Sequence, residues 1–470
     1  MLTLSVKKLI EVVGGKLLAG DENTMVNGLA IDSRDVGPGA AFVAFAGEHV
    51  DGHEFVAPAL SAGARAIIVT RDDEVIRETI ARSRRHDVAL VMVDDATAAV
   101  QELASYHRER LMCPVIGVTG STGKTTTKDF LRSVLGMGMR VVATEANMNN
   151  ELGVPLTIMR AGADTGVLVV EMAMRGAGQI ARLAEIARPT AGLVTNVGVS
   201  HIEILGSEEA IASAKGELVQ AIPQSGRVVL NGDDAWSATL FDLTGAAITT
   251  YGLAETCDVR ATDVTLSDTG TPVFMLCTEQ GSARVELPIP GRHNVYNALS
   301  AAAVSLYLEV SLGDVVSGLE QATFTAMRME VFQTATRVTV VNDAYNANPT
   351  SMRAALDALV DLPAEGRRIA VLGDMAELGS LEELAHFRMG EYAASLGLDA
   401  LVTVGPRAKR IADGALAVGM AAAVVRPCLA ADEASEVLDD LLQPGDVVLV
   451  KASRVMGLER VVDGITNPHV

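Results

Sequence analysis

Residues 117–128 combine glycine, hydroxyl and lysine side chains in an order that suits the binding of a phosphate chain. Glycines tolerate positive φ and let backbone N–H groups approach an anion closely. Lys124 supplies a cation for the outer phosphates, and the Thr125 hydroxyl is a ligand that Mg²⁺ accepts. The stretch departs from the common G-x-x-x-x-G-K-[ST] spacing, because Val118 stands where the first glycine belongs. The simpler alternative is a glycine-rich turn before a Thr-rich helix. We predict a nucleoside triphosphate site at Gly120, Ser121, Thr122, Gly123, Lys124, Thr125 and Thr126.

A second group able to do chemistry is the carboxylate of Glu171, which ends the apolar run 167–170. Ligands of parallel sheets bind at the carboxyl ends of the strands. Carboxylate oxygens coordinate Mg²⁺, so Glu171 is the first candidate to share a metal ion with Thr125. The alternative is a capping or salt-bridged glutamate.

Two polar loops near the N-terminus, 32–34 and 47–53, lie beside expected strands. Ser33 and Arg34 carry a hydroxyl and a guanidinium, which could hydrogen-bond a phosphate or the edge of a uracil ring. Composition alone supports two ordinary surface loops equally well.

Composition describes a folded, acidic chain. The 470 residues carry a formal net charge of −21, so their overall field repels nucleic-acid phosphate, and we expect no nucleic-acid partner. The four cysteines are scattered without a C-x-x-C pair, which fits a reducing cytoplasm. Lys7 and Lys8 interrupt the N-terminal apolar run, and no segment offers eighteen uninterrupted apolar residues. The sequence therefore predicts neither a signal peptide nor a membrane span.

The elements that must position these groups alternate between strands and helices, which indicates α/β domains with parallel sheets. We predict three domains: an N-terminal α/β substrate domain at 1–111, a central doubly wound parallel sheet of the P-loop type at 112–328, and a C-terminal Rossmann-like domain at 329–470. Residues 254–288 suggest a small antiparallel annex. No G-x-G-x-x-G is present, so a dinucleotide is not expected.

The patterns place expected elements along the whole chain. The expected helices lie at 6–13, 55–62, 98–111, 207–222, 295–308, 351–359 and 382–395. The expected strands lie at 28–32, 41–46, 66–69, 167–170, 191–197, 227–231, 338–342, 368–372, 400–404 and 446–450.

Nearly the whole chain resembles the Mur ligases. The motifs that carry the resemblance are 32–34, 119–128, 147–155, 201–203, 214–217, 291–298, 343–349 and 372–379. The central motifs are typical of the whole superfamily, which includes the folylpolyglutamate synthases. The two C-terminal motifs, Asp343 to Pro349 and Leu372 to Gly379, favour the members that attach D-alanyl-D-alanine to UDP-N-acetylmuramoyl-tripeptide. The chain departs from the usual family pattern at Ala46, Ala173, Gln179 and Ala452.

The resemblance implies an ATP-dependent amide ligase that acts through an acyl phosphate. It implies that Lys124 holds the β and γ phosphates and that Thr125 and Glu171 bind one Mg²⁺. A second Mg²⁺ is implied near His201 and a carbamylated Lys215. Judged by residue type alone, a satisfied loop histidine and a solvated helix lysine are the commoner roles.

The resemblance also assigns binding residues. His293, Asn294 and Asn297 match adenine-side positions, although Asn294 could equally cap the following helix. Arg328 and Asp343 match positions near the γ-phosphate and the ribose. The implied substrate-binding residues are Ser33, Arg34, Asn149, Asn150, Tyr345, Asn346 and Asn348.

Two other functions compete with this hypothesis. One is a related Mur-type or folylpolyglutamate-type ligase with a different amine acceptor, against which the two C-terminal motifs argue. The other is a nucleotide-dependent switch, but the Asn-Lys-x-Asp and Leu-Ser-Gly-Gly motifs of the common switch and transporter ATPases are absent. We expect a cytoplasmic monomer that uses ATP and two Mg²⁺ ions, with UDP-N-acetylmuramoyl-tripeptide and D-alanyl-D-alanine as its substrates.

Overall fold

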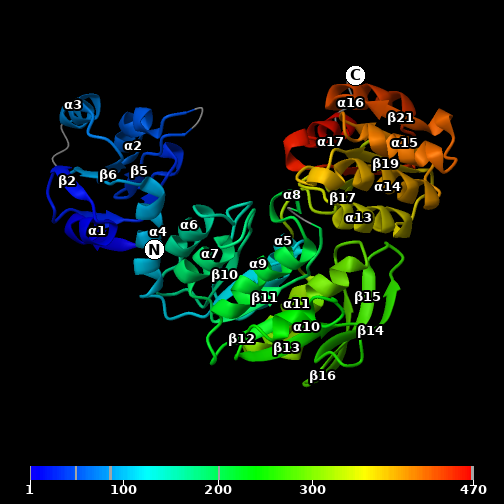
Figure 1. The fold of residues 1–470 in the computed structure, drawn as a ribbon, viewed down its shortest axis with the longest axis horizontal. Coiled ribbons are helices and arrows are strands. Elements are labelled where there is room, and N and C mark those ends of the chain that lie inside the picture. The colour runs from blue at the N-terminus through cyan, green and yellow to red at the C-terminus, as the bar shows by residue number, and fades with distance from the viewer. Residues whose placement is uncertain (1, 48–49, 84–86, 200–201, 467–470) are drawn as a thin grey trace. The chain divides into compact units, whose positions relative to one another are not determined.

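The computed structural model describes residues 2–47, 50–83, 87–199 and 202–466 (Figure 1). The three-domain α/β architecture predicted from the sequence is confirmed. Packing divides the chain into two compact units, which are described separately. The first unit comprises Met1–Gly117, Met139–Met174 and Gln179–Ala191, and the second comprises Val118–Gly138, Arg175–Gly178 and Gly192–Val470.

The N-terminal domain lies in the first unit and contains a five-stranded sheet of order β2-β7-β6-β5-β4. Its strands are parallel except β2, which pairs antiparallel with β7. Alternate strand residues such as Phe42 and Ile67 form a buried core with α2 and α3. The elements are β1 Thr3–Ser5, α1 Val6–Val13, β2 Lys16–Ala19, β3 Met25–Asn27, β4 Leu29–Ala30, η1 Ser33–Asp35, β5 Ala41–Val43, η2 Gly52–Phe55, α2 Val56–Ala62, β6 Ala66–Val69, α3 Glu74–Arg82, β7 Ala89–Met92 and α4 Ala96–Arg108.

The first unit also holds one edge of the central sheet, in the order β8-β10-β9. Strand β10 runs parallel to β9, and Leu168 N–H donates to Pro114 C=O at the start of β8. Helix α4 packs against α6 and α7. The elements are β8 Val115–Thr119, β9 Val141–Ala143, α6 Gly153–Arg160, β10 Val167–Glu171 and α7 Gln179–Ala187.

The rest of the central sheet lies in the second unit, in the order β16-β15-β14-β13-β12-β11-β8. Strands β12, β13 and β14 are parallel, whereas β14, β15 and β16 pair antiparallel, so the predicted antiparallel annex is confirmed. Helix α5 packs against α11 and α12. The elements are α5 Lys124–Leu135, β11 Ala191–Val194, α8 Ile202–Leu205, α9 Glu208–Ala221, β12 Arg227–Asn231, α10 Ser237–Phe241, β13 Ala247–Gly252, β14 Val259–Leu266, β15 Pro272–Thr278, β16 Gly281–Glu286, α11 His293–Tyr307 and α12 Leu312–Glu320.

The C-terminal domain, yellow to red in Figure 1, contains a sheet of order β17-β18-β22-β19-β20-β21. Only the edge strand β17 is antiparallel to its neighbour. Alternate residues of β18, β19, β20 and β22 pack against α16 and α17, as the period of two in a strand requires. The elements are β17 Glu330–Gln333, β18 Thr339–Asn342, α13 Pro349–Asp361, β19 Arg368–Gly373, η3 Gly379–Leu381, α14 Glu382–Ser395, β20 Ala400–Val404, α15 Lys409–Ala417, η4 Ala422–Val424, β21 Val425–Cys428, α16 Ala431–Leu441, β22 Val447–Lys451, η5 Arg454–Met456 and α17 Glu459–Thr466.

Most expected elements form, and several differ at their ends. Strand 28–32 is shortened to Leu29–Ala30, because the Asp32 carboxylate accepts the Arg34 N–H and turns the chain into η1. Helix 98–111 spans Ala96–Arg108, since Asp95 caps its start. Helix 295–308 begins two residues earlier, at His293.

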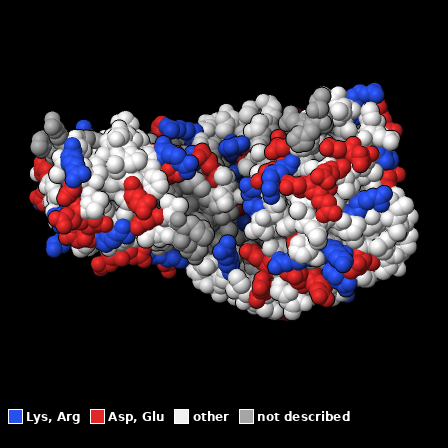
Figure 2. All heavy atoms as spheres, turned by 90° about the horizontal axis from the view of Figure 1, so that it is seen from above, with Lys and Arg blue, Asp and Glu red and all other residues white. Residues whose placement is uncertain are grey.

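Charged side chains are scattered over the surface among uncharged ones (Figure 2). On the face drawn in Figure 2, acidic side chains lie among basic ones rather than in a separate field. Among the described helices, none is long and apolar enough to span a bilayer.

Candidate active site

The turn between β8 and α5, residues 120–123, is called the glycine loop here. Gly120 and Gly123 have φ of 148° and 81°, a region that favours glycine. A Cβ on Gly120 would lie 1.8 Å from Thr195 Oγ1, and a Cβ on Gly123 would lie 2.3 Å from Asn297 Oδ1. Neither position has room for a side chain, so the loop keeps its backbone close to its neighbours and opens onto the N-terminus of α5. That geometry suits a phosphate group.

The segment that follows β11 supports the glycine loop. Thr195 Oγ1 donates to Thr122 C=O over 2.6 Å. Asn196 Oδ1 accepts the Thr122 N–H over 3.0 Å, and its backbone C=O accepts the Ser121 N–H over 2.9 Å. Sequence reasoning missed Thr195 and Asn196. They could have been found by the argument used for Glu171, because they are polar residues that follow a buried strand at the carboxyl edge of a parallel sheet.

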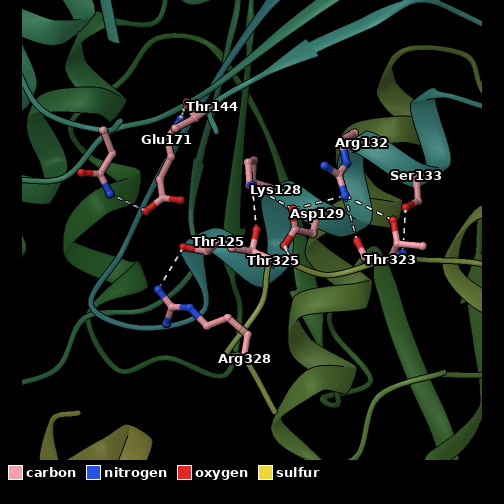
Figure 3. Close-up of polar contacts among 11 residues, drawn as sticks. Thr125, Lys128, Asp129, Arg132, Ser133, Thr144, Glu171, Thr323, Thr325 and Arg328 are labelled. Carbon is pink, nitrogen blue, oxygen red and sulfur yellow. Dashed lines mark hydrogen bonds and ion pairs between the residues drawn. The ribbon is translucent and has the colours of Figure 1, made fainter. Parts of the chain in front are cut away.

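Three predicted nucleotide residues, Lys124, Thr125 and Arg328, lie at the start of α5 or contact it. Lys124 Nζ donates to Gly120 C=O over 2.8 Å, so the lysine folds back over the glycine loop. Arg328 Nη2 donates to Thr125 Oγ1 over 3.3 Å, as Figure 3 shows. The Arg328 guanidinium also stacks on the Tyr345 ring, 4.1 Å from its centroid. The fold thus brings the Thr125 hydroxyl of α5, the Arg328 guanidinium and the Tyr345 ring together from three separate segments.

Lys215 lies on α9 and is only 2% exposed. Burial lowers its pKa well below the usual 10.5, and the charge of Lys124 lowers it further. The lysine is therefore buried in the second unit and is not the solvated helix lysine of the alternative reading. His201, the predicted neighbour in the metal site, lies outside the described residues.

The predicted adenine residues lie in the first turns of α11. Asn294 Nδ2 donates to Pro290 C=O over 2.7 Å, and Asn294 Oδ1 accepts from Asn297 Nδ2 over 2.8 Å. Asn294 is inside the helix, so the capping alternative is wrong. Both amides are buried, and Asn297 Oδ1 accepts from Thr127 Oγ1 of α5 over 3.4 Å. Their contact with adenine stays a prediction. Burial lowers the pKa of His293 to about 4.

Asp343 and Lys451 form a buried ion pair at the carboxyl ends of β18 and β22. Lys451 Nζ lies 2.5 Å from Asp343 Oδ2 and donates to Asn346 C=O over 2.9 Å. Asp343 Oδ1 accepts the Met329 N–H over 3.2 Å. Burial lowers the pKa of Lys451. The pair connects the predicted ribose residue to the loop that carries Tyr345 and Asn346.

Two predicted substrate-binding residues of the C-terminal domain also have structural partners. Asn348 Oδ1 accepts the Ser351 N–H over 2.8 Å, and Ser351 reciprocates, which forms a capping box at the start of α13. Asn346 Oδ1 accepts the Ala347 N–H over 2.9 Å. Sequence reasoning missed the capping box, although Asn348-Pro349 followed by Ser351 is a recognisable helix start. Substrate binding by Tyr345, Asn346 and Asn348 stays a prediction.

In the first unit, Glu171 ends β10 and is buried. Its Oε1 accepts from Asn149 Nδ2 over 2.8 Å, and its backbone N–H donates to Thr144 Oγ1 over 2.9 Å. Asn150 Oδ1 accepts the N–H of Gly153 over 2.9 Å at the start of α6. The amide of Asn149 orients a carboxylate, which is a common arrangement for a metal ligand. Among the described residues no three of His, Cys, Asp and Glu cluster, so the metal set, which includes a threonine and a lysine, stays a prediction.

The N-terminal candidates lie on η1. Arg34 is exposed and pairs with Asp32 over 2.5 Å, and its hydrogen bonds to that carboxylate lower the pKa of Asp32 to about 2. Ser33 lies between them on the same turn. The pair leaves the guanidinium at the surface, where its substrate role stays a prediction.

Three protein-family models together match most of the chain. Residues 25–108 match the Mur ligase family, catalytic domain; residues 118–305 match the Mur ligase middle domain; and residues 327–454 match the Mur ligase, glutamate ligase domain. Each match falls within one of the three sequence-predicted segments, apart from residues 327 and 328.

Individual relatives extend over the full chain. The UDP-N-acetylmuramoyl-tripeptide–D-alanyl-D-alanine ligase of Bacillus subtilis is 37% identical over 479 residues, covering 100% of both chains. A crystal structure of MurF from Acinetobacter baumannii has a TM-score of 0.87 at 32% identity and covers 99% of both chains. MurF ligase from Thermotoga maritima, solved in complex with ADP, has a TM-score of 0.78 at 28% identity, covering 93% of this chain and 96% of that one.

Proposed function

The chain belongs to the Mur ligase family, and from this we propose that it joins D-alanyl-D-alanine to UDP-N-acetylmuramoyl-tripeptide with the hydrolysis of ATP. The products are the UDP-N-acetylmuramoyl-pentapeptide precursor of peptidoglycan, ADP and phosphate. The observation that carries this proposal is end-to-end similarity, at 37% identity, to a ligase named for that reaction. The glycine loop supports it, since it has the form expected of a phosphate site.

The proposed reaction has two steps. An oxygen of the tripeptide carboxylate attacks the γ-phosphorus of ATP, which forms an acyl phosphate and releases ADP. The amine of D-alanyl-D-alanine then attacks the acyl carbon, loses a proton and displaces inorganic phosphate. Phosphoryl transfer depends chiefly on positioning and charge neutralisation, which are the roles that we assign to Lys124 and Arg328. Asp343, His293, Asn294 and Asn297 are assigned to the nucleoside end of ATP.

Two Mg²⁺ ions are part of the proposal, with Thr125, Glu171, His201 and Lys215 as the protein ligands. The metal would neutralise phosphate charge. Lys215 could serve as a ligand only after it gains a negative charge. Its buried amine with a lowered pKa supports this, because a neutral amine reacts with CO₂: an N–C bond forms, a proton leaves and a carbamate results. We further propose a cytoplasmic monomer.

The experiment that tests the proposal is phosphate release from ATP and Mg²⁺. UDP-N-acetylmuramoyl-tripeptide and D-alanyl-D-alanine are supplied together and then one at a time, and mass spectrometry follows the pentapeptide. We expect phosphate release and pentapeptide only when both substrates are present. In Lys124→Met we expect neither phosphate release nor pentapeptide. Release that is independent of the peptide substrates would refute the ligase and favour a nucleotide-dependent switch. Product with another amine, but not with D-alanyl-D-alanine, would favour a different acceptor.

A further inference from the structure

Residues 323–329, called the linker here, lead from the central domain into the C-terminal domain and carry Arg328. Met327 and Met329, on either side of Arg328, have φ of 60° and 49°, in the left-handed region that non-glycine residues rarely occupy. Such a conformation persists only where surrounding contacts impose it. The position of Arg328 therefore depends on how firmly the linker is held at both ends.

The C-terminal end of the linker is held by Asp343, through the Met329 N–H described above. Its N-terminal end is held by Asp129 and Lys128 of α5. Asp129 Oδ2 accepts the Thr325 N–H over 2.8 Å, and Lys128 Nζ approaches both Asp129 Oδ1, at 2.8 Å, and Thr325 Oγ1, at 3.4 Å. Figure 3 shows these side chains converging on the linker beside the Arg328 contact.

The Lys128–Asp129 pair has no place in the proposed chemistry, yet both side chains are buried, with exposed fractions of 1% and 0%. A buried ion pair stabilises a fold poorly, because desolvation offsets most of the attraction. In some proteins such pairs specify a local geometry instead. Asp129 lies one helical turn after Thr125 on α5, so one rigid helix carries both the hydroxyl that Arg328 contacts and the carboxylate that holds its linker.

We propose that Asp129, paired with Lys128, is a positioning residue that holds Arg328 against Thr125 and so aligns the γ-phosphate for transfer. The inference rests on the proposed function, because the phosphate role of Arg328 does. Asp129 acts through the linker backbone, and its contribution should be present only while the Arg328 side chain is present.

The test is a double-mutant cycle between Asp129→Asn and Arg328→Ala, measured as kcat, as KM for each substrate and as affinity for a non-hydrolysable ATP analogue. A displacement of about 1 Å at a positioning group can cost on the order of a hundredfold in rate. We expect kcat to fall at least about tenfold in Asp129→Asn, with KM for D-alanyl-D-alanine unchanged, whereas adding Asp129→Asn to Arg328→Ala should cause less than a twofold further loss. Met327→Gly leaves the buried pair intact but gives the linker backbone more conformational freedom at a residue with left-handed φ. It should lower kcat in the same way.

The matched control is Asp446→Asn. Asp446 is also a buried carboxylate, paired with Arg367 at 2.7 Å and accepting the Arg367 N–H, but it precedes β22, at the end of the sheet opposite Asp343. Asp446→Asn should lower thermal stability but leave kcat unchanged. If Asp129→Asn lowers kcat and analogue affinity by the same factor in the wild-type protein and in Arg328→Ala, the inference is overturned. Wild-type protein without peptide-dependent phosphate release would overturn the proposed function instead, and the analogue-affinity cycle would still test the role of Asp129.

Discussion

Replacing Lys451 by methionine should destabilise the C-terminal domain through the carboxylate that it leaves behind. That carboxylate belongs to Asp343. The side chains of Lys451 and Asp343 are 2% and 11% exposed, and Lys451 Nζ lies 2.5 Å from Asp343 Oδ2. Removing one partner of a buried pair costs about 3–5 kcal/mol. Asp343 keeps the Met329 N–H, so we expect the lower end, about 3 kcal/mol of unfolding free energy, which corresponds to about 6–12 °C in Tm for a domain of this size.

The assay is urea unfolding followed by circular dichroism and by the fluorescence of Trp236, the single tryptophan, which lies in the central domain. If the domains unfold separately, Lys451→Met should shift the dichroism transition and leave the fluorescence transition in place. The control is the double variant Lys451→Met, Asp343→Asn. It removes both charges and should be clearly more stable than the sum of the single effects. Strict additivity, or a loss below about 1 kcal/mol, would refute the reasoning from a buried pair.

Three further predictions concern the nucleotide site. Gly120→Ala places a Cβ 1.8 Å from Thr195 Oγ1, so affinity for an ATP analogue measured by calorimetry should fall on the order of a hundredfold, whereas Gly138→Ala, in open space, should leave it unchanged. Removing CO₂ from the buffers should lower phosphate release at least about tenfold, bicarbonate should restore it, and Lys215→Arg should not respond; wild-type activity indifferent to CO₂ would exclude a carbamate. The folded chain binds no proton at His293 between its lowered pKa of about 4 and the ordinary 6.5, whereas the unfolded chain does. Unfolding free energy should therefore fall by up to about 3 kcal/mol as pH drops through that window, and an identical fall in His293→Gln would contradict this origin.

What the sequence determined by itself is local. The glycine loop follows from the glycine, hydroxyl and lysine positions within residues 117–128, and the structure places it between β8 and the start of α5. Helix α1 and the antiparallel annex follow in the same way from patterns that repeat every few residues. Residue types at such spacing fix hydrogen bonds and buried faces without reference to the rest of the chain.

Only the tertiary structure decided which side chains meet. Thr195 supports the glycine loop across 73 positions, Lys451 pairs with Asp343 across 108, and Arg328 reaches Thr125 across 203. No periodicity relates residues so far apart, and whether a lysine is a solvated cation or a buried partner depends on what surrounds it. Lys215 and Lys451 acquire their chemistry from desolvation, an energy that exists only after the chain has folded around them.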